Sequence, residues 1–420
     1  MKNSGIEWIG EIPDKWDKNI LACVFMEHKQ KNLGLRENNL LSLSYGKIVR
    51  KDIETAEGLL PASFETYNII AKDDIIFRLT DLQNDQRSLR TALCYEKGII
   101  TSAYIALRAI VNVSSKYMHY LFYSYDICKV FYGLGAGIRQ GMNYSDLKKL
   151  PILIPPITEQ QKIAEVLDEK CGKIDKLIEN EQKQIEKMKE YKQSVITSAV
   201  TKGLDKSVPM KDSGIDWIGA IPESWQLRKL NYCFDLIGSG TTPKSDNEEF
   251  YGEEIAWLQS GDINGGYVYK TEKMIVGKAI ETYSALKIYQ APFLAVAMYG
   301  ASVGNCSIVK LDATTNQACC VMSKSKGYLK YLFYCILAGK IALIDLAKGG
   351  TQPNISQEII RNFRVPYPLT NEQKEIADYL DEKCGKIDEV ISIKQRKIEK
   401  LQEYKKSLIY EYVTGKKEVG

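Results

Sequence analysis

The sequence predicts an α+β protein built as a tandem repeat: two globular α/β parts, each followed by a long helix, with the two helices packed antiparallel about a pseudo-two-fold axis. Three observations lead to this prediction. The string LDEKCGKID occurs at 167–175 and again, unchanged, at 380–388. Larger blocks around both copies recur in the same order. The segments that carry the string contain no proline and repeat an apolar residue every eleven positions, which is typical of long helices.

The repeated blocks divide the chain, and finding them first matters because a missed repeat misassigns the whole fold. The pairs are SGIEWIGEIPDKW (4–16) and SGIDWIGAIPESW (213–225), YMHYLFY (117–123) and YLKYLFY (328–334), RQGMNYS (139–145) and TQPNIS (351–356), and IPPITEQQKIAEVLDEKCGKID (154–175) and VPYPLTNEQKEIADYLDEKCGKID (365–388). We expect a first globular part at 1–155, a central helical spacer and linker at 156–209, a second globular part at 210–366 and a C-terminal helical spacer at 367–420.

Each globular part is expected to mix strands with helices. Runs rich in β-branched and apolar residues predict strands at 73–79, 101–111, 291–298 and 306–311. Apolar spacing predicts a helix at each YxxYLFY run, whose aromatic side chains suit a core better than a base-stacking surface. The apolar stretch 331–347 contains Lys340 and Asp345, so it is typical of a buried helix and not of a membrane span.

The long helices are predicted at 159–200 and 372–413. Eleven residues make three turns of a nearly relaxed helix, so an eleven-residue repeat stays on one face. The isoleucines of this stripe are Ile163, Ile174, Ile185, Ile196, Ile376, Ile387, Ile398 and Ile409. Positions three residues further on, including Leu177 and Val390, widen the stripe. We expect the helices to bury it against each other; burial against a partner protein is the alternative.

Composition argues against catalysis by this chain. With only 2 histidines, the chain has little material for a Ser-His-Asp triad or a His-rich metal site. Its 10 cysteines form no CxxC pair and suit buried, reduced thiols. Neither a phosphate-binding GxxxxGK[ST] loop nor an Asn-Pro-Pro-aromatic tetrad is present. We therefore expect no metal or cofactor in this chain.

Charge and the N-terminus add two expectations. The net charge of +4 is spread almost evenly, so no part is basic enough to indicate nucleic acid by composition alone. If the chain binds DNA, positive charge must be arranged locally or supplied by a partner. The first residues, MKNSGIEWIG, lack a signal-peptide core, so we expect a cytoplasmic location and no membrane partner.

Polar loops between the repeated blocks carry the candidate binding residues. Arginine suits guanine edges or phosphates and carboxamides suit adenine, whereas Gly-rich loops can cradle a phosphate through backbone N–H groups. The candidates for contact with DNA are Gln83, Asn84, Arg87, Arg90, Arg139, Gln140, Asn143, Thr241, Lys244, Gln259, Ser260, Asp262, Gln352 and Asn354. Solvated loops and plain turns are the alternative interpretation of the same residues.

With these blocks in view, the sequence resembles the specificity subunit of type I restriction-modification systems over nearly its whole length. The resemblance rests on the doubled SGI[ED]WIGxIPxxW openings and the doubled EQ…LDEKCGKID segments. It also rests on the segments QGMNYS and QPNIS, which precede the latter. One departure is the extra residue in PLTNEQ compared with PITEQ, so the two docking surfaces need not be equivalent.

The resemblance implies a non-catalytic DNA-binding subunit. Its two globular parts would be target recognition domains that read the two parts of a bipartite, asymmetric site in double-stranded DNA. The helices would set their spacing and dock two methyltransferase subunits, to which restriction and motor subunits are added. S-adenosylmethionine, ATP and Mg would belong to those partners. A helical scaffold or adaptor without DNA readout is the alternative.

Overall fold

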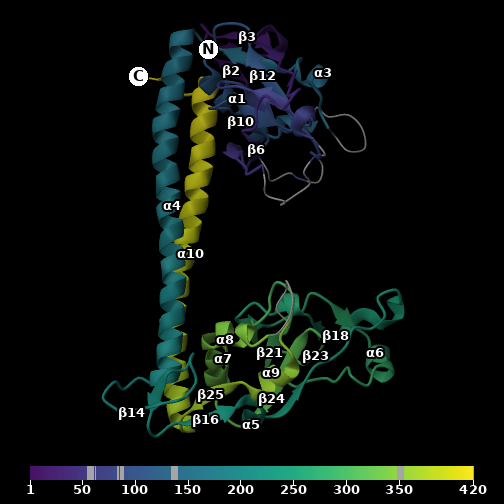
Figure 1. Ribbon diagram of the computed structural model, residues 1–420, viewed down its shortest axis with the longest axis vertical. Coiled ribbons are helices and arrows are strands. Elements are labelled where there is room, and N and C mark those ends of the chain that lie inside the picture. Colours follow the sequence, from purple (N-terminus) through teal and green to yellow (C-terminus); the bar gives the residue numbers. More distant parts are fainter. Residues whose placement is uncertain are drawn as a thin grey trace. The chain divides into compact units, whose positions relative to one another are not determined.

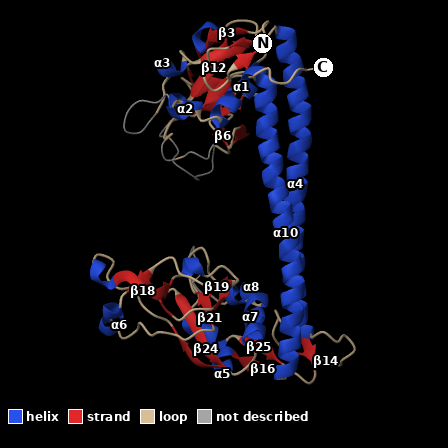
Figure 2. Cartoon of the chain, turned by 180° about the vertical axis from the view of Figure 1, so that it is seen from behind, coloured by secondary structure: helices blue, strands red, loops and turns tan. Residues whose placement is uncertain are grey.

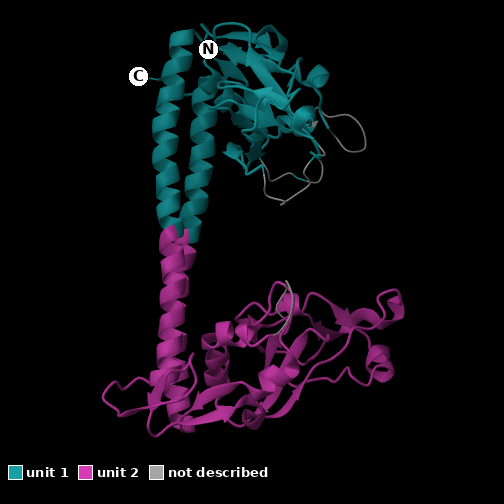
Figure 3. Cartoon of the chain, in the orientation of Figure 1, with its two compact units in different colours: residues 1–182, 395–420 teal, residues 183–394 magenta. Residues whose placement is uncertain are grey.

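The computed structural model of the chain describes residues 1–53, 61, 63–82, 85, 89–133, 141–347 and 354–419. The chain folds as two compact units: residues 1–182 with 395–420 form unit 1, and residues 183–394 form unit 2 (Figure 3). Each unit therefore contains one globular part and a stretch of each long helix. The domain boundaries expected from the sequence count the helices separately and stay a prediction.

The two long helices are α4 (Ile157–Lys202) and α10 (Thr370–Val413), each slightly longer at its start than predicted. In each unit a stretch of α4 runs beside a stretch of α10 (Figure 1). In unit 1 the Lys405 ammonium lies 2.7 Å from Asp175, and Lys397 lies 2.6 Å from Glu181. In unit 2 Lys192 lies 2.7 Å from Asp388. Residue numbers rise along one helix as they fall along the other, so the pairing is antiparallel.

The apolar stripe is narrower than the eleven-residue pattern suggests. All eight of its isoleucines are buried. Three positions further on, Leu177 is 47% exposed and Val390 38% exposed, whereas Ala199 and Tyr412, which belong to the cores of the globular parts, are buried. A single partner helix covers a seam and not a wide face, so the flanking positions are partly left to solvent.

Unit 1 contains short strands around a helix. Its strands are β1 (Lys2–Asn3), β2 (Glu11–Ile12), β3 (Asp17–Ile20), β4 (Phe25–Glu27), β5 (Gln30–Lys31), β6 (Leu41–Ser44), β7 (Lys47–Arg50), β8 (Asn68–Ile70), β9 (Ile75–Phe77), β10 (Thr91–Leu93), β11 (Gly98–Ile100), β12 (Ile105–Ala109) and β13 (Pro151–Ile154). Its helices are α1 (Ser115–Ile127), α2 (Val130–Gly133) and α3 (Tyr144–Leu147). The main sheet has the order β10-β9-β12-β4, and a second sheet has the order β11-β8-β5.

Unit 2 has the same plan with a larger sheet (Figure 2). Its strands are β14 (Met210–Asp212), β15 (Ala220–Pro222), β16 (Gln226–Lys229), β17 (Phe234–Gly238), β18 (Tyr251–Leu258), β19 (Tyr267–Val268), β20 (Met274–Ile275), β21 (Phe293–Ala297), β22 (Cys306–Val309), β23 (Ala313–Thr315), β24 (Cys319–Ser325) and β25 (Arg364–Tyr367). Its helices are α5 (Leu230–Cys233), α6 (Gly277–Thr282), α7 (Leu329–Ala338), α8 (Lys340–Asp345) and α9 (Gln357–Asn362). The sheets have the orders β17-β24-β21-β22-β19 and β20-β18-β23. The four predicted strands are present as β9, β12, β21 and β22.

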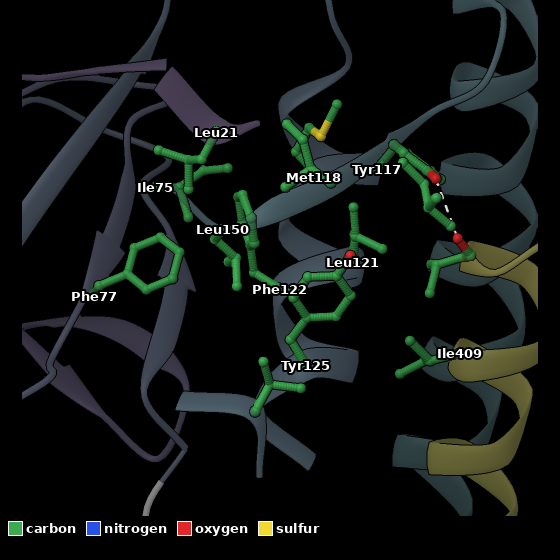
Figure 4. Packing of buried hydrophobic residues seen from close by; sticks show 14 of the residues in the cluster. Leu21, Ile75, Phe77, Tyr117, Met118, Leu121, Phe122, Tyr125, Leu150 and Ile409 are labelled. Carbon is green, nitrogen blue, oxygen red and sulfur yellow. Dashed lines mark hydrogen bonds between the residues drawn. The ribbon is translucent and has the colours of Figure 1, made fainter. Parts of the chain in front are cut away.

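The core of unit 1 joins the sheet to both long helices. Side chains of α1, including Leu121 and Phe122, pack between sheet residues such as Phe77 and the α10 residue Ile409 (Figure 4). The Tyr117 hydroxyl donates a hydrogen bond of 3.2 Å to the Val413 carbonyl at the end of α10. The end of the second helix is therefore part of the first unit's core.

The stretch predicted as one buried helix at 331–347 is two helices, α7 and α8, separated at Gly339. A Cβ at Gly339 would lie 2.5 Å from the Phe363 ring, so glycine permits the close approach of these segments. The prediction was wrong about continuity because this contact is not visible in the apolar spacing. Within the described residues, no helix combines the length and apolarity needed to cross a membrane.

Candidate nucleic-acid interface

The helix junction, where α1 or α7 meets α4 and α10, is built alike in both units. In unit 1 the buried Gln160 side chain accepts a hydrogen bond from the Ser114 N–H (2.9 Å) and donates one to the Pro155 carbonyl (2.8 Å). In unit 2 Gln373 accepts from the Tyr328 N–H (2.8 Å) and donates to the Pro368 carbonyl (2.8 Å). The repeated Glu-Gln dipeptide thus fixes the start of the aromatic helix against the start of the long helix.

A charged cluster completes each helix junction. Asp168 accepts from Lys116 at 2.5 Å and from the Tyr120 hydroxyl at 2.8 Å. Asp381 likewise accepts from Lys330 and, at 2.7 Å, from the Tyr334 hydroxyl. The hydrogen bond to Asp381 raises the pKa of Lys330, which keeps the Lys330 ammonium protonated.

These pairs correct the register of the repeat. Tyr117 and Tyr331 are both fully buried, and their hydroxyls donate to Val413 and Val200 at the ends of the two long helices. Tyr117 is therefore equivalent to Tyr331, and not to Tyr328 as the alignment of YMHYLFY with YLKYLFY implies. A tyrosine every third residue makes that alignment ambiguous, and the hydrogen bonds resolve it.

The units differ at the edges of their sheets. In unit 2, β17 and β21 both run antiparallel to β24, with Gly238 opposite Val321 and Ala297 opposite Cys319. β18 runs parallel to β23, and the Gly240 N–H donates to the Thr315 hydroxyl at 3.0 Å. The chain therefore leaves β17, β18, β21 and β23 at one edge.

This edge gathers the predicted candidates of the second half. Thr241 and Lys244 follow β17, Gln259, Ser260 and Asp262 follow β18, and Asn354 precedes α9. The segment before α9 joins them because the Ile355 N–H donates to the Met298 carbonyl after β21 at 2.7 Å. Lys244 and Asn354 are exposed, whereas Thr241, Gln259, Ser260 and Asp262 are partly covered.

Several polar groups here hold the loops instead of facing outward. The Asp262 carboxylate accepts the Gln259 N–H at 2.8 Å and the Glu272 N–H at 3.1 Å. The Ser302 hydroxyl donates to the Ser260 carbonyl at 2.7 Å, and the Asn305 side chain donates to the Ile263 carbonyl at 3.1 Å. Asp262 is thus engaged in supporting its loop in this structure.

Sequence reasoning missed the turn between β23 and β24. Gln317 is exposed there and its side-chain oxygen accepts the Thr242 hydroxyl at 2.6 Å. A polar Asn-Gln pair between two short β-branched or apolar runs was the available signal, and it marks a turn at a sheet edge.

In unit 1 the corresponding edge lies after β9. The Arg78 N–H donates to the Arg90 carbonyl at 2.8 Å and closes the loop between β9 and β10. The Met142 N–H donates to the Leu79 carbonyl at 2.9 Å, as Ile355 does to Met298 in unit 2. Leu79 and Met142, which flank the two polar segments predicted for the first half, are therefore adjacent. Arg78, which sequence reasoning did not select, has a side chain about one-third exposed.

Arg90 does not fit its predicted role as a DNA contact. Its side chain is fully buried, and the guanidinium donates to the carbonyls of Thr80 (3.0 Å) and Asp85 and to the Tyr132 hydroxyl (3.3 Å). A guanidinium engaged in this way stabilises the backbone at Thr80 and Asp85 and is not accessible to solvent. The sequence could not separate this from a base contact, because arginine is equally suited to both.

Asn143 has a structural partner as well. Its side chain accepts the Asp146 N–H at 3.2 Å and caps α3 in a capping box. The remaining candidates, Gln83, Asn84, Arg87, Arg139, Gln140 and Gln352, lie outside the described residues. A further polar surface, which the sequence analysis did not select, is the β6–β7 hairpin, where Tyr45 is 83% exposed beside the exposed Lys47 and Arg50.

Among the described residues, the edge of unit 2 presents amide, hydroxyl and cationic side chains, namely Gln317, Thr242 and Lys244, and the edge of unit 1 presents the partly exposed Arg78. Such groups can accept and donate to base edges and phosphates. Among the described residues, no group of three or more His, Cys, Asp or Glu side chains is arranged to hold a metal ion.

Comparisons with known proteins agree on a family. The model of the type I restriction modification DNA specificity domain matches residues 61–189 and 222–403. The type I restriction enzyme MjaVIII specificity subunit of Methanocaldococcus jannaschii is 26% identical over 335 residues, which cover 76% of this chain and 75% of the relative. The EcoR124I/EcoR124II specificity subunit of Escherichia coli is 22% identical and covers 70% of this chain and 71% of its own length.

A solved structure shares the fold. It is described as "Structural basis underlying complex assembly and conformational transition of the type I R-M system", and it matches with a TM-score of 0.70 at 16% identity, covering 96% of this chain and 98% of the other. At that identity the likeness concerns the fold alone.

Proposed function

We propose, from the fact that this chain belongs to the family of type I restriction-modification specificity subunits, that it reads a bipartite, asymmetric DNA target with one unit for each part. In this proposal it docks two methyltransferase subunits and performs no chemistry itself. S-adenosylmethionine, ATP and Mg act in the partner subunits, which include the restriction and motor subunits.

The observation that carries the proposal is the contrast between equal helix junctions and unequal edges. Gln160 and Gln373 make matching hydrogen bonds, and Asp168 and Asp381 hold matching Lys–Tyr pairs. Equivalent junctions suit two copies of one partner. The loops at the sheet edges differ in length and chemistry, which suits two different half-sites.

Exchange of the edges tests the assignment of one half-site to each unit. Replacing residues 17–138 with the same region of a relative should change one half of the methylated motif and leave the other half. Methylome sequencing of cells with and without the gene supplies the readout. A chain that gathers proteins without reading DNA would add no motif in either form.

Single substitutions at the unit 2 edge refine the test. Lys244→Ala and Gln317→Ala should each weaken recognition of the second half-site by about 1 to 3 kcal/mol if the side chain makes a bidentate base contact. Lys326→Ala is the matched control, since Lys326 is an exposed lysine beyond the far end of β24 that pairs with Asp235 at 2.8 Å. Unchanged specificity in both edge variants would remove these residues from the interface.

A further inference from the structure

Unit 2 contains a large apolar groove at the side of its helix junction. It encloses about 1020 Å³ and is lined by Trp217, Ala338, Ile341, Leu346 and Phe363, together with polar residues at its rim. Ile341 is 70% exposed and Leu346 54% exposed. Trp217 and Phe363 stack with ring centroids 5.4 Å apart, which gives the groove a flat aromatic wall. Because these apolar side chains are gathered around one groove instead of being scattered singly, they mark a candidate binding surface.

The equivalent position in unit 1 is occupied. Thr197 lines the groove from α4, and the repeat makes it equivalent to Tyr410 of α10. The Tyr410 hydroxyl donates to the Trp8 carbonyl at 2.9 Å, so its ring covers this side of unit 1. The cavity that remains there measures about 270 Å³. Tyr410 in place of Thr197, together with Lys406 in place of Gln193, thus lines a smaller cavity in unit 1.

Charge at the rim restricts the occupant. Asp216, Asp345 and Glu358 are exposed carboxylates around the groove, and Arg364 is an exposed cation there. An adjoining cavity of about 690 Å³ shares Asp216 and adds Glu190 and the cation Lys202, so carboxylates outnumber cations around the two cavities by four to two. Three or four carboxylates repel a phosphate backbone, so DNA is a poor occupant. A partner with an apolar face and basic flanks is complementary.

The shape of the lining favours a helix. The groove is lined by side chains of α4, α7, α8 and α9, by the loop residues 215–217 and by Arg364 at the start of β25. Most of the lining is therefore helical, and ridges of helical side chains accept another helix.

We propose that this groove docks one amphipathic helix of a partner protein, with its apolar face against Trp217, Ile341 and Phe363 and its Lys or Arg residues beside the acidic rim. Unit 1 lacks the site because Tyr410 fills it and because Lys406 occupies the place of Gln193. The chain therefore binds this partner once, although its sequence is duplicated. The proposal goes beyond DNA reading and does not depend on it.

The test uses the full chain and a fluorescently labelled synthetic helix of about 18 residues, roughly five turns, with Leu on one face and Lys on the rest. Fluorescence anisotropy should give one bound peptide per chain. Ile341→Lys should weaken binding about tenfold or more by removing an exposed apolar anchor and adding like charge. Leu369→Lys, at a position 82% exposed and outside the groove, is the matched control and should bind as the wild type does.

A second variant introduces into unit 2 the tyrosine that unit 1 has at the equivalent position. Thr197→Tyr should close the groove and reduce peptide binding as strongly as Ile341→Lys, while leaving the fold intact because Thr197 is only partly buried. A peptide with Glu in place of Lys should bind at least about tenfold more weakly than the Lys peptide.

Three results would overturn the proposal: no binding of the Lys peptide, equal binding of the Glu peptide, or undiminished binding to Thr197→Tyr. Self-association of the chain that Ile341→Lys abolishes would replace the helical partner with a second copy. DNA methylation by the assembled complex is measured separately, so a failure of DNA reading would not be confused with a failure of docking.

Discussion

The buried carboxyl of Asp126 is hydrogen-bonded to the loop at the sheet edge of unit 1. Burial raises its pKa to about 6, and one of its oxygens accepts the Arg90 N–H at 2.5 Å. In the unfolded chain the carboxyl has an ordinary pKa of 3.8. Because the folded pKa is the higher one, the unfolded state loses its proton first as pH rises. Stability contributed by this group is therefore present below about pH 4 and is lost between about pH 4 and 6.

Asp126→Asn should remove this pH dependence, since an amide does not titrate. The difference in unfolding free energy between the variant and the wild type should shift by about 2 to 3 kcal/mol in favour of the variant between pH 4 and pH 7. Denaturant titrations at the two pH values give the answer. A constant difference would mean that Asp126 has an ordinary pKa in the fold.

Gln373 is a second side chain whose substitution should change the free energy of unfolding. Gln373→Leu leaves the Tyr328 N–H and the Pro368 carbonyl without their hydrogen bonds in a buried place. We expect a loss of about 2 to 4 kcal/mol, because each unsatisfied buried group costs about 1 to 3 kcal/mol. Gln402→Leu, at an exposed position of the same helix, should change the denaturation midpoint little.

The sequence identifies such residues unevenly. The Ile stripe follows from spacing alone, because burial of an apolar side chain needs no particular partner. Arg90, Asp262 and Asn143 were selected as polar loop residues, yet their hydrogen bonds go to backbone groups of the protein. Whether a polar side chain faces its own loop or solvent depends on contacts between distant segments, and spacing does not encode those contacts.

On α4, substitutions at a buried position facing α10 and at an exposed position beside it should differ in their effect on stability. Ile185→Ala should lower the unfolding free energy by about 2 to 4 kcal/mol, because it opens a cavity at a position 5% exposed. Leu177→Ala, on the same helix at a position 47% exposed, should cost well below half of that. Equal losses in chemical denaturation would show that the seam is wider than the burial indicates.

Element types were predictable where the pattern is long, and boundaries were not. Both long helices extend beyond their predicted starts because prolines are tolerated just before a first turn. The break at Gly339 depends on the Phe363 ring, which lies 24 residues away in the sequence. The three-residue error in matching Tyr117 has the same origin: local periodicity repeats, whereas the hydrogen bond to Val413 is made once.

In the chain as a whole, each repeat completes the core of the other. Val413 of the second helix receives Tyr117 in unit 1, and Val200 of the first helix receives Tyr331 in unit 2. This affects how the proposed spacer should be altered. An insertion near Ser198 would displace Ile196, Ala199 and Val200, which belong to the core of unit 2. Insertions after Gln182 and Lys394, at the boundaries between the units, leave both cores untouched.

Paired insertions there test whether the helices set the gap between half-sites. Eleven residues in each helix keep both Ile stripes in phase and add about 16 Å, close to five base pairs and half a turn of DNA. We expect a folded protein with near wild-type stability whose original motif is no longer methylated, because the second half-site would face the other side of the duplex.

Insertion of four residues in each helix adds about 6 Å, near two base pairs. That variant should be less stable, since its stripes shift out of phase, yet it should methylate a target whose gap is longer and whose half-sites are unchanged. Methylome sequencing reports both outcomes. If both variants methylated the original motif at its original gap, the helices would not be measuring DNA, and their antiparallel seam would serve only to join the units.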